Sequence, residues 1–249
     1  IGLVWVVRLF CLKSNKVHFQ RKYFKLKLRL ATEIMKLGTP PFILNLCTAS
    51  ITIALINRMG VYGGDFAVGA YGIVSRIYML FSMVIIGLSI GMQPIIGFNY
   101  GAGLMDRVIK TLNMGLTIAF IFMFSVFLLS EMATTPIIRL FSDETSLNDI
   151  AIVGLRLCAW TFPVMAVQTT MTNFFQSIGK PKTSIILSLI RQIGFLIPLI
   201  FILPEVFNLG LNGIWLSIPC ADSIACIVTV FVYLRFRQRS KCHVAITTI

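Results

Sequence analysis

The sequence predicts an all-α, polytopic membrane protein, on the evidence of its apolar composition and of its evenly spaced hydrophobic runs. Hydrophobic residues make up 57% of the 249 residues and charged residues only 12%, whereas a soluble domain needs more charge at its surface. All the runs but the first have the roughly 20 residues that a helix needs to cross about 30 Å of hydrocarbon. The runs cover residues 1–12, 38–57, 67–98, 108–130, 149–175, 183–203 and 210–234.

The segments between these runs alternate in charge, and the alternation predicts the topology. Lys and Arg accumulate in short cytoplasmic loops of membrane proteins, so the basic segments are expected in the cytoplasm. The stretches around Asp65, Asp143 and Glu205 are acidic or nearly uncharged, and they are expected outside. The C-terminus is then cytoplasmic. The four predicted cytoplasmic segments are 13–36, 100–108, 177–182 and 235–249.

The same pattern divides the chain into four parts. Residues 1–12 span only roughly 18 Å as a helix, which is too short to cross, so they are interpreted as the truncated end of a preceding transmembrane helix. Residues 13–37 form a basic cytoplasmic linker that is expected to lie on anionic headgroups. A six-helix transmembrane lobe follows over 38–236, and a basic tail over 237–249. Six spans joined by short loops are typical of one half of a two-lobed transporter, so we expect the back part of a longer protein.

The net charge of +13 does not predict a nucleic-acid partner, because the charge follows the loops and forms no single patch. The bilayer is the expected partner instead. An intramembrane protease would need His residues within the spans, but His18 and His243 both lie outside them. No catalytic set, metal site or cofactor is therefore predicted, and the protein is not expected to be an enzyme.

Helix-breaking residues occur within several spans. Pro94, Pro163, Pro198 and Pro219 all fall inside apolar runs. Such breaks persist at membrane depth only where neighbouring helices or a water-filled cavity satisfy the freed backbone groups. The set favours a transport cavity, although packing between helices is an alternative for any single position.

Charged side chains lie deep within the spans at Arg76, Arg191 and Asp222, whereas Arg156 lies only about seven residues from the outer end of its span and can snorkel outward. A charge at the bilayer centre costs about 2.5–3.5 kcal/mol on insertion scales, so each needs a structural or functional reason. Arg191 and Asp222 can pair if their helices adjoin. Two hypotheses stay open: an ion pair that locks the bundle, or a role in handling substrate or protons.

Motifs along the lobe resemble the C-terminal half of multidrug and toxin extrusion (MATE) transporters, with the greatest similarity to the bacterial branch. The most specific mark lies at the end of the second full span, and weaker marks occur at 36–40, 175–181 and 213–222. The residues of this motif are Gln93, Pro94, Asn99, Tyr100 and Gly101.

The resemblance implies helices seven to twelve of a twelve-helix protein with two six-helix lobes, in the bacterial plasma membrane. It also implies antiport of organic cations, including drugs, in exchange for protons or sodium ions. The N-terminal lobe is the implied partner and the implied location of the coupling carboxylate. Depth in the membrane and the resemblance together indicate substrate contacts at Asn45, Asn173, Gln176 and Met171.

Three alternatives remain. A lipid-linked oligosaccharide flippase of the same superfamily would be expected to line its cavity with several Arg or Lys for a pyrophosphate, whereas Arg76 and Arg191 are only two. A seven-helix receptor would need a full first helix. The third alternative is a fragment that folds but transports nothing.

Overall fold

The computed structural model describes residues 28–247, which form helices joined by short turns. No strand occurs in this part of the chain. Residues 1–27, which hold the predicted truncated helix and most of the predicted linker, lie outside the described residues, as do 248–249. The chain separates into two compact units: a first unit that ends at Ile43, and a second unit, from Leu44 onward, that contains most of the helices.

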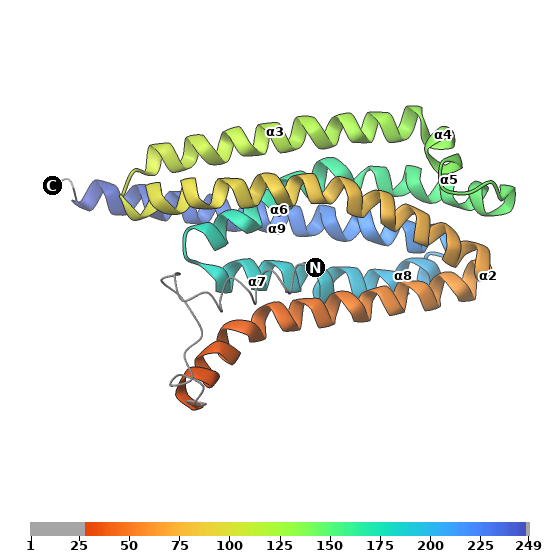
Figure 1. The fold of residues 1–249 in the computed structure, drawn as a ribbon, viewed down its shortest axis with the longest axis horizontal. Helices are drawn as coiled ribbons and strands as arrows, with labels where there is room; N and C mark the ends of the chain where they lie inside the picture. The colour runs from red at the N-terminus through yellow and green to blue at the C-terminus, as the bar shows by residue number, and fades with distance from the viewer. Residues whose placement is uncertain (1–27, 248–249) are drawn as a thin grey trace, which may run out of the picture. The chain divides into compact units, whose positions relative to one another are not determined.

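The longest helical element, α2 (Leu28–Gly101), contains two of the predicted spans. Its apolar part from Pro41 to Gly101 has 61 residues and would measure about 90 Å if straight, three times the hydrocarbon thickness. The helix breaks at Gly64, whose φ of 63° favours glycine because a side chain would clash there. The chain turns back at this point (Figure 1), so that residues 44–63 form a first arm and residues 65–101 a second arm.

The next predicted span is α3 (Met105–Met132), which is followed by the short α4 (Thr134–Arg139). The predicted span 149–175 is formed by two helices, α5 (Thr145–Ala159) and α6 (Thr161–Ser177), which meet at an angle of 48°. Pro163 explains this bend, because its ring lacks an N–H and clashes with the carbonyl four residues earlier, at the end of α5.

Each of the last two predicted spans is one continuous helical segment in the structure. The first consists of α7 (Pro181–Leu189), the π-helical segment η2 (Ile190–Leu196) and α8 (Ile197–Val206). The second is α9 (Gly210–Thr247). Helix α9 extends into the predicted cytoplasmic tail.

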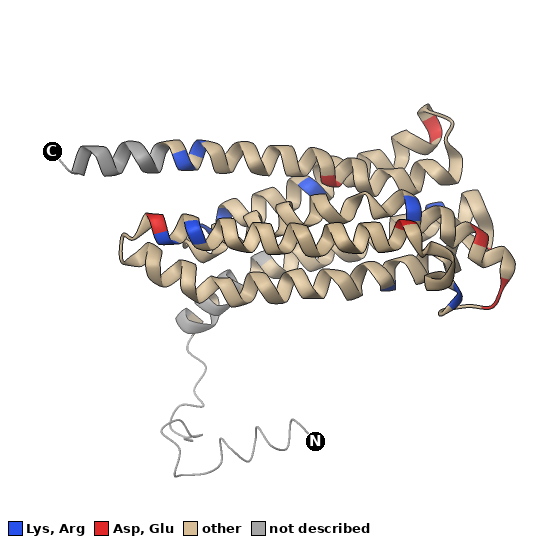
Figure 2. Ribbon diagram, turned by 90° about the horizontal axis from the view of Figure 1, so that it is seen from above, with Lys and Arg blue, Asp and Glu red and all other residues tan. Residues whose placement is uncertain are grey.

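Length and hydropathy identify four helices that could cross a membrane, and the bent pair α5–α6 makes a fifth candidate. Because α2 turns back at Gly64, these five stretches correspond to six passages. The chain is therefore a multi-pass membrane protein with the predicted all-α fold. Most charged residues lie towards the two ends of the second unit, and the stretches between them are largely uncharged (Figure 2).

Buried side chains form three clusters among the described residues. The first contains Trp215 and the arms of α2 on either side of Gly64, the second Phe175 and Tyr233, and the third Phe162 with Met123. Large apolar side chains also remain exposed, for example Phe98 and Ile227. Such a surface suits contact with lipid tails or with another apolar helix.

Candidate functional site

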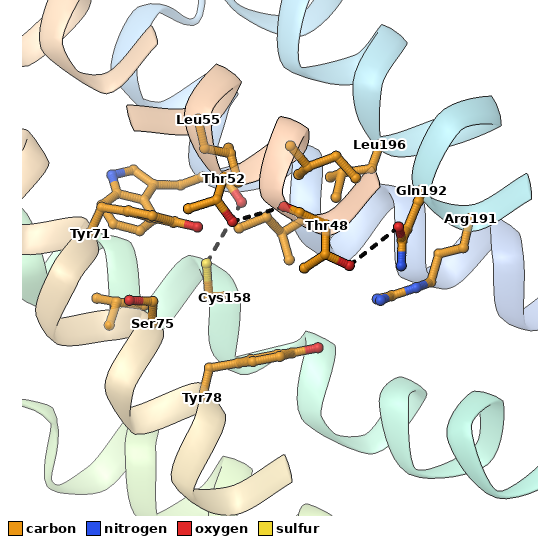
Figure 3. A pocket seen from close by; sticks show the side chains of 14 residues that line it. Thr48, Thr52, Leu55, Tyr71, Ser75, Tyr78, Cys158, Arg191, Gln192 and Leu196 are labelled. Carbon is orange, nitrogen blue, oxygen red and sulfur yellow. Dashed lines mark hydrogen bonds between the residues drawn. The ribbon is translucent and has the colours of Figure 1, made fainter. Parts of the chain in front are cut away.

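A cavity of about 190 Å³ lies inside the second unit, at the level of the first cluster. Five segments wall it: both arms of α2, helix α5, the π-helical segment η2 and helix α9 (Figure 3). One part of the wall is polar and includes Thr48, Tyr78 and Arg191, whereas the other is apolar and includes Leu55 and Trp215. The cavity therefore offers a polar and an apolar region side by side, and it is partly open at its surface.

An ion pair lies beside the cavity. Arg191 Nη1 donates a hydrogen bond of 2.7 Å to Asp222 Oδ1. The two helices therefore adjoin, and the two charges within the spans form the pair that the sequence allowed. The Asp222 side chain is only 1% exposed, whereas that of Arg191 is 28% exposed. Asp222 Oδ2 has no hydrogen-bond partner among the described residues. The carboxylate thus lies behind the guanidinium, and the cavity is lined by the positive member of the pair.

The π-helical segment accounts for the position of Arg191. At its end, the N–H of Ile197 donates to the carbonyl of Gln192, five residues earlier instead of four. Pro198 lacks an N–H and disfavours the usual α-helical bond, which explains why the wider turn occurs here. The extra residue in the turn changes the direction of the preceding helix, so that Arg191 and Gln192 both line the cavity although they are consecutive.

Hydroxyl and amide groups complete the polar region. The Tyr78 hydroxyl points towards the Arg191 guanidinium (Figure 3). The Thr48 hydroxyl donates to the carbonyl of Leu44 at 2.9 Å and lies 3.5 Å from Gln192 Oε1. These contacts link the first arm of α2 to η2 across the cavity.

Helix α9 is shaped at this level by Pro219. This residue prevents the usual helical bond to the carbonyl of Trp215. That carbonyl instead lies 3.8 Å from Cys158 Sγ, a weak donor on α5. The Trp215 ring is fully buried and packs near Tyr71, with 6.3 Å between the ring centroids. The apolar part of the cavity therefore has a fixed aromatic wall.

The charge on the cavity wall is of one sign, positive. Arg191 is the only charged residue among those that line it, and no Asp or Glu does. Within residues 28–247, no group of three or more His, Cys, Asp or Glu side chains is close enough to hold a metal ion. The polar end of the site can donate hydrogen bonds to a bound molecule, and the other end can pack against its apolar groups.

The residues predicted to contact substrate lie elsewhere, and none of them lines this cavity. Asn45 and Gln176 are exposed and Asn173 is half-buried. Met171 is 7% exposed and belongs to the second cluster, together with Phe174. These four substrate contacts remain predictions.

Arg76 is exposed on the second arm of α2 and does not line the cavity. It is therefore separate from the pair of Arg191 and Asp222, and its role also remains a prediction.

The family motif lies where α2 ends and the chain turns into α3. Asn99 Nδ2 donates to the carbonyl of Ile95 at 2.8 Å, and the carbonyl of Asn99 accepts from the N–H of Leu104. The N–H of Gly103 donates to the carbonyl of Tyr100, and Gly103 has a φ of 74°. The motif thus builds a tight turn between two spans. Gln93 and Pro94 precede this turn on the second arm, and Gly101 is the last residue of α2.

Several residues that line the cavity were not predicted from the sequence. Thr48, Ser75, Tyr78 and Cys158 carry no signal that sets them apart from other polar or small residues in an apolar run. Their proximity depends on which helices are neighbours, and that information is absent from local patterns.

Comparison with known proteins identifies the family. The family model for MatE matches residues 40–202, which is more than half of the chain. The chain belongs to the MatE family. The match includes both arms of α2 and most of the cavity wall.

Curated relatives of this MatE chain include the multidrug export protein MepA of two staphylococci. The protein of Staphylococcus aureus (strain bovine RF122 / ET3-1) is 25% identical over 233 residues, which are 92% of this chain and 50% of MepA. That of Staphylococcus haemolyticus (strain JCSC1435) is 25% identical over 240 residues, or 96% of this chain and 51% of MepA. The chain thus spans about half the length of the curated relatives it matches.

Solved structures show the same fold. An inward-facing multidrug resistance MATE family transporter of the MOP superfamily superposes with a TM-score of 0.85 at 22% identity, over 97% of this chain and 55% of that one. An outward-facing structure of such a transporter superposes with a TM-score of 0.78 at 21% identity, over 96% of this chain and 53% of that one. The fold of this chain therefore corresponds to about half of a MATE transporter.

Proposed function

We propose that this chain forms the C-terminal six-helix lobe of a secondary multidrug antiporter, which exports organic cations in exchange for protons or sodium ions. The observation that carries the proposal is the similarity to multidrug export protein MepA, which extends over 92% of this chain and half of MepA. A second six-helix lobe of the full-length protein is the corresponding partner. The chemistry is transport without covalent change.

Alternating access requires the lobe to move as one body against its partner. The interior of the second unit supports such a movement, because the three buried clusters and the pair of Arg191 and Asp222 hold its helices together. A lobe that repacked during each cycle would expose the buried carboxylate of Asp222 to lipid or water. We therefore place the movement between lobes.

Substrate is proposed to bind in the cleft between the two lobes. Asn45, Asn173 and Gln176 have exposed or half-exposed side chains that can orient a flat cation. The thioether of Met171, 7% exposed, becomes available only if neighbouring side chains move. The coupling carboxylate is proposed to belong to the other lobe, since Asp222 is 1% exposed and is already paired with Arg191.

A flippase for lipid-linked oligosaccharides is less well supported. A pyrophosphate carries several negative charges and requires a cluster of cationic groups. Arg191 is the one cationic residue among those that line the cavity, and its charge is balanced by Asp222. Arg76 does not line this cavity.

Efflux measurements test the proposal. We expect the full-length protein, expressed in bacteria that lack their own efflux pumps, to lower cellular ethidium, and to do so only while an ion gradient persists. Asn173→Ala and Gln176→Ala should each lower the rate, because a polar contact to the bound cation is lost. Arg139→Gln, at an exposed site on α4, is the matched control and should leave efflux unchanged.

Two results would contradict the proposal. One is the absence of ethidium efflux at a normal level of membrane-inserted protein. The other is efflux that continues after both proton and sodium gradients have been collapsed.

A further inference from the structure

We propose that the cavity inside this lobe binds a small amphipathic molecule with an acidic or hydrogen-bond-accepting headgroup, of the aryl-carboxylate class. The headgroup is held by Arg191 and Tyr78, and the apolar body lies against Trp215. This site is separate from the proposed substrate contacts, none of which lines the cavity. The inference goes beyond the proposed export of cations.

The arrangement of the ion pair determines which charge of headgroup the cavity favours. Asp222 is 1% exposed and lies behind Arg191, whose 28% exposed side chain lines the cavity. A bound molecule therefore meets the guanidinium first. The pair as a whole is neutral, so a neutral acceptor can also bind, but a cation would meet the wrong end of the dipole.

Unused donor capacity supports an acceptor at this position. A guanidinium carries five N–H donors in a fixed fork; the bond to Asp222 Oδ1 uses one of them and the contact with the Tyr78 hydroxyl a second, which leaves three. The Tyr78 hydroxyl and the Gln192 amide lie on either side of it and can donate as well (Figure 3). A carboxylate needs several donors at once, and Arg is the side chain that matches its geometry best.

The remainder of the cavity fits an apolar body. Its wall away from Arg191 is formed by Ile51, Leu55, Leu196 and the rings of Tyr71 and Trp215. The volume of about 190 Å³ exceeds the roughly 150 Å³ of an engineered apolar cavity that binds benzene. One aromatic ring with a short acidic arm therefore matches both the size and the polarity of the space.

The absence of a lining carboxylate separates this site from one for organic cations. Neither Asp nor Glu lines the cavity, and Asp222 is shielded by its partner. An aromatic wall alone attracts cations by about 0.5–2 kcal/mol, but here it lies in the same cavity as a guanidinium. We therefore expect the site to discriminate against amines.

Three probes of nearly equal shape test this inference. Phenylacetate, phenylacetamide and phenethylamine share one ring and one short arm, but their headgroups are anionic, neutral and cationic. Binding to the full-length protein in lipid nanodiscs is measured by isothermal titration calorimetry, with empty nanodiscs subtracted for partition into lipid. We expect phenylacetate to bind about tenfold or more tightly than phenethylamine, with phenylacetamide between them.

Variants assign the preference to the ion pair. Replacing Arg191 alone would leave Asp222 buried and unpaired, so the informative variant is the double change Arg191→Gln with Asp222→Asn. It should bind phenylacetate and phenylacetamide equally well within about twofold, because the guanidinium that favours an anionic headgroup has been removed together with its buried counter-charge. Arg139→Gln removes an exposed charge outside the cavity and should retain the order of the three probes.

Three outcomes would overturn the inference: equal binding of the acid and the amine, a double variant that still prefers the acid, and no binding of any probe to folded protein. None of them bears on ethidium efflux, which is measured independently. Failure of this inference is thus distinguishable from failure of the proposed transport function.

Discussion

At the scale of single residues, a glycine allows one of the close contacts between two spans. A Cβ atom added to Gly154 on α5 would lie 2.6 Å from the indole ring of Trp215 on α9. The ring is fully buried and cannot move without displacing its neighbours. We expect Gly154→Ala to destabilise the protein by about 1–3 kcal/mol, as overpacking of a core does. Thermal unfolding in detergent measures this effect.

The control for this change is Gly87→Ala on the second arm of α2. An added Cβ there meets nothing within 4 Å, and alanine is a better helix former than glycine. The control should match the parent or exceed it. Equal stability of the two alanine variants would show that the contact at Gly154 yields without cost.

The ion pair gives the second prediction at this scale. Asp222→Asn leaves the guanidinium of Arg191 without its counter-charge, and breaking a buried pair costs about 3–5 kcal/mol. Since Arg191 is partly exposed, we expect a loss towards the lower end of this range. In the full-length protein, Asp222→Asn should lower thermal stability more than it alters the pH dependence of efflux.

The double change with Arg191→Gln should recover much of the lost stability, because it leaves no unpaired charge. If Asp222→Asn retained the parent's stability but abolished the pH dependence of efflux, Asp222 would be the coupling acid instead of a structural residue.

At the scale of elements, the π-helical segment is the feature on which the cavity depends. The segment from Ile190 to Leu196 contains one residue more than an α-helix would place there. Deleting Ile193, whose side chain is 48% exposed, should restore the α-helical register. The preceding helix would then rotate by about 100°, and Arg191 would move away from Asp222.

We expect this deletion to lower the thermal unfolding temperature about as much as Asp222→Asn does, because both break the same pair. The substitution Ile193→Ala is the matched control, since it removes an exposed side chain and keeps the register. A deletion variant as stable as this control would mean that the segment adapts without losing the pair.

Spans and breaks could be predicted from the sequence because they depend on local composition. Six spans were predicted from apolar runs, and Pro163 and Pro198 indicated where helices would bend. The direction of each bend could not be predicted, since a proline disfavours one hydrogen bond without choosing the replacement. The cavity depends on which spans adjoin, so Tyr78 and Cys158 were missed. Arg191 and Asp222 were recognised because a charge at that depth requires a partner.

At the scale of the whole molecule, aromatic and charged groups hold the two ends of the bundle in the second unit. At the predicted outer end, Arg58 pairs with Glu205 at 2.7 Å, and its guanidinium lies 4.3 Å from the centre of the Phe201 ring. At the predicted cytoplasmic end, Lys180 Nζ lies 4.3 Å from the centre of the Phe236 ring. Exposed ion pairs contribute only about 0–1 kcal/mol, so these contacts fix the helix ends more than they stabilise the fold.

The last prediction is the orientation of these ends in the membrane. The turn that contains Lys180 and Lys182 is basic, whereas the turn before α5 contains Asp143 and Glu144. Because basic loops are retained in the cytoplasm, a cysteine introduced as Pro181→Cys should be inaccessible to a membrane-impermeant maleimide in intact cells. A cysteine introduced as Thr145→Cys should react. Both positions are exposed, so burial in the protein cannot explain a difference between them.

The unmodified chain supplies the background, since it already contains six cysteines. Permeabilised cells supply the second control, in which both introduced cysteines should react equally. Reaction at position 181 from outside intact cells would reverse the orientation. It would also place the basic end of α9 on the wrong side of the membrane for the proposed transporter, because the same alternation of charge assigns both segments.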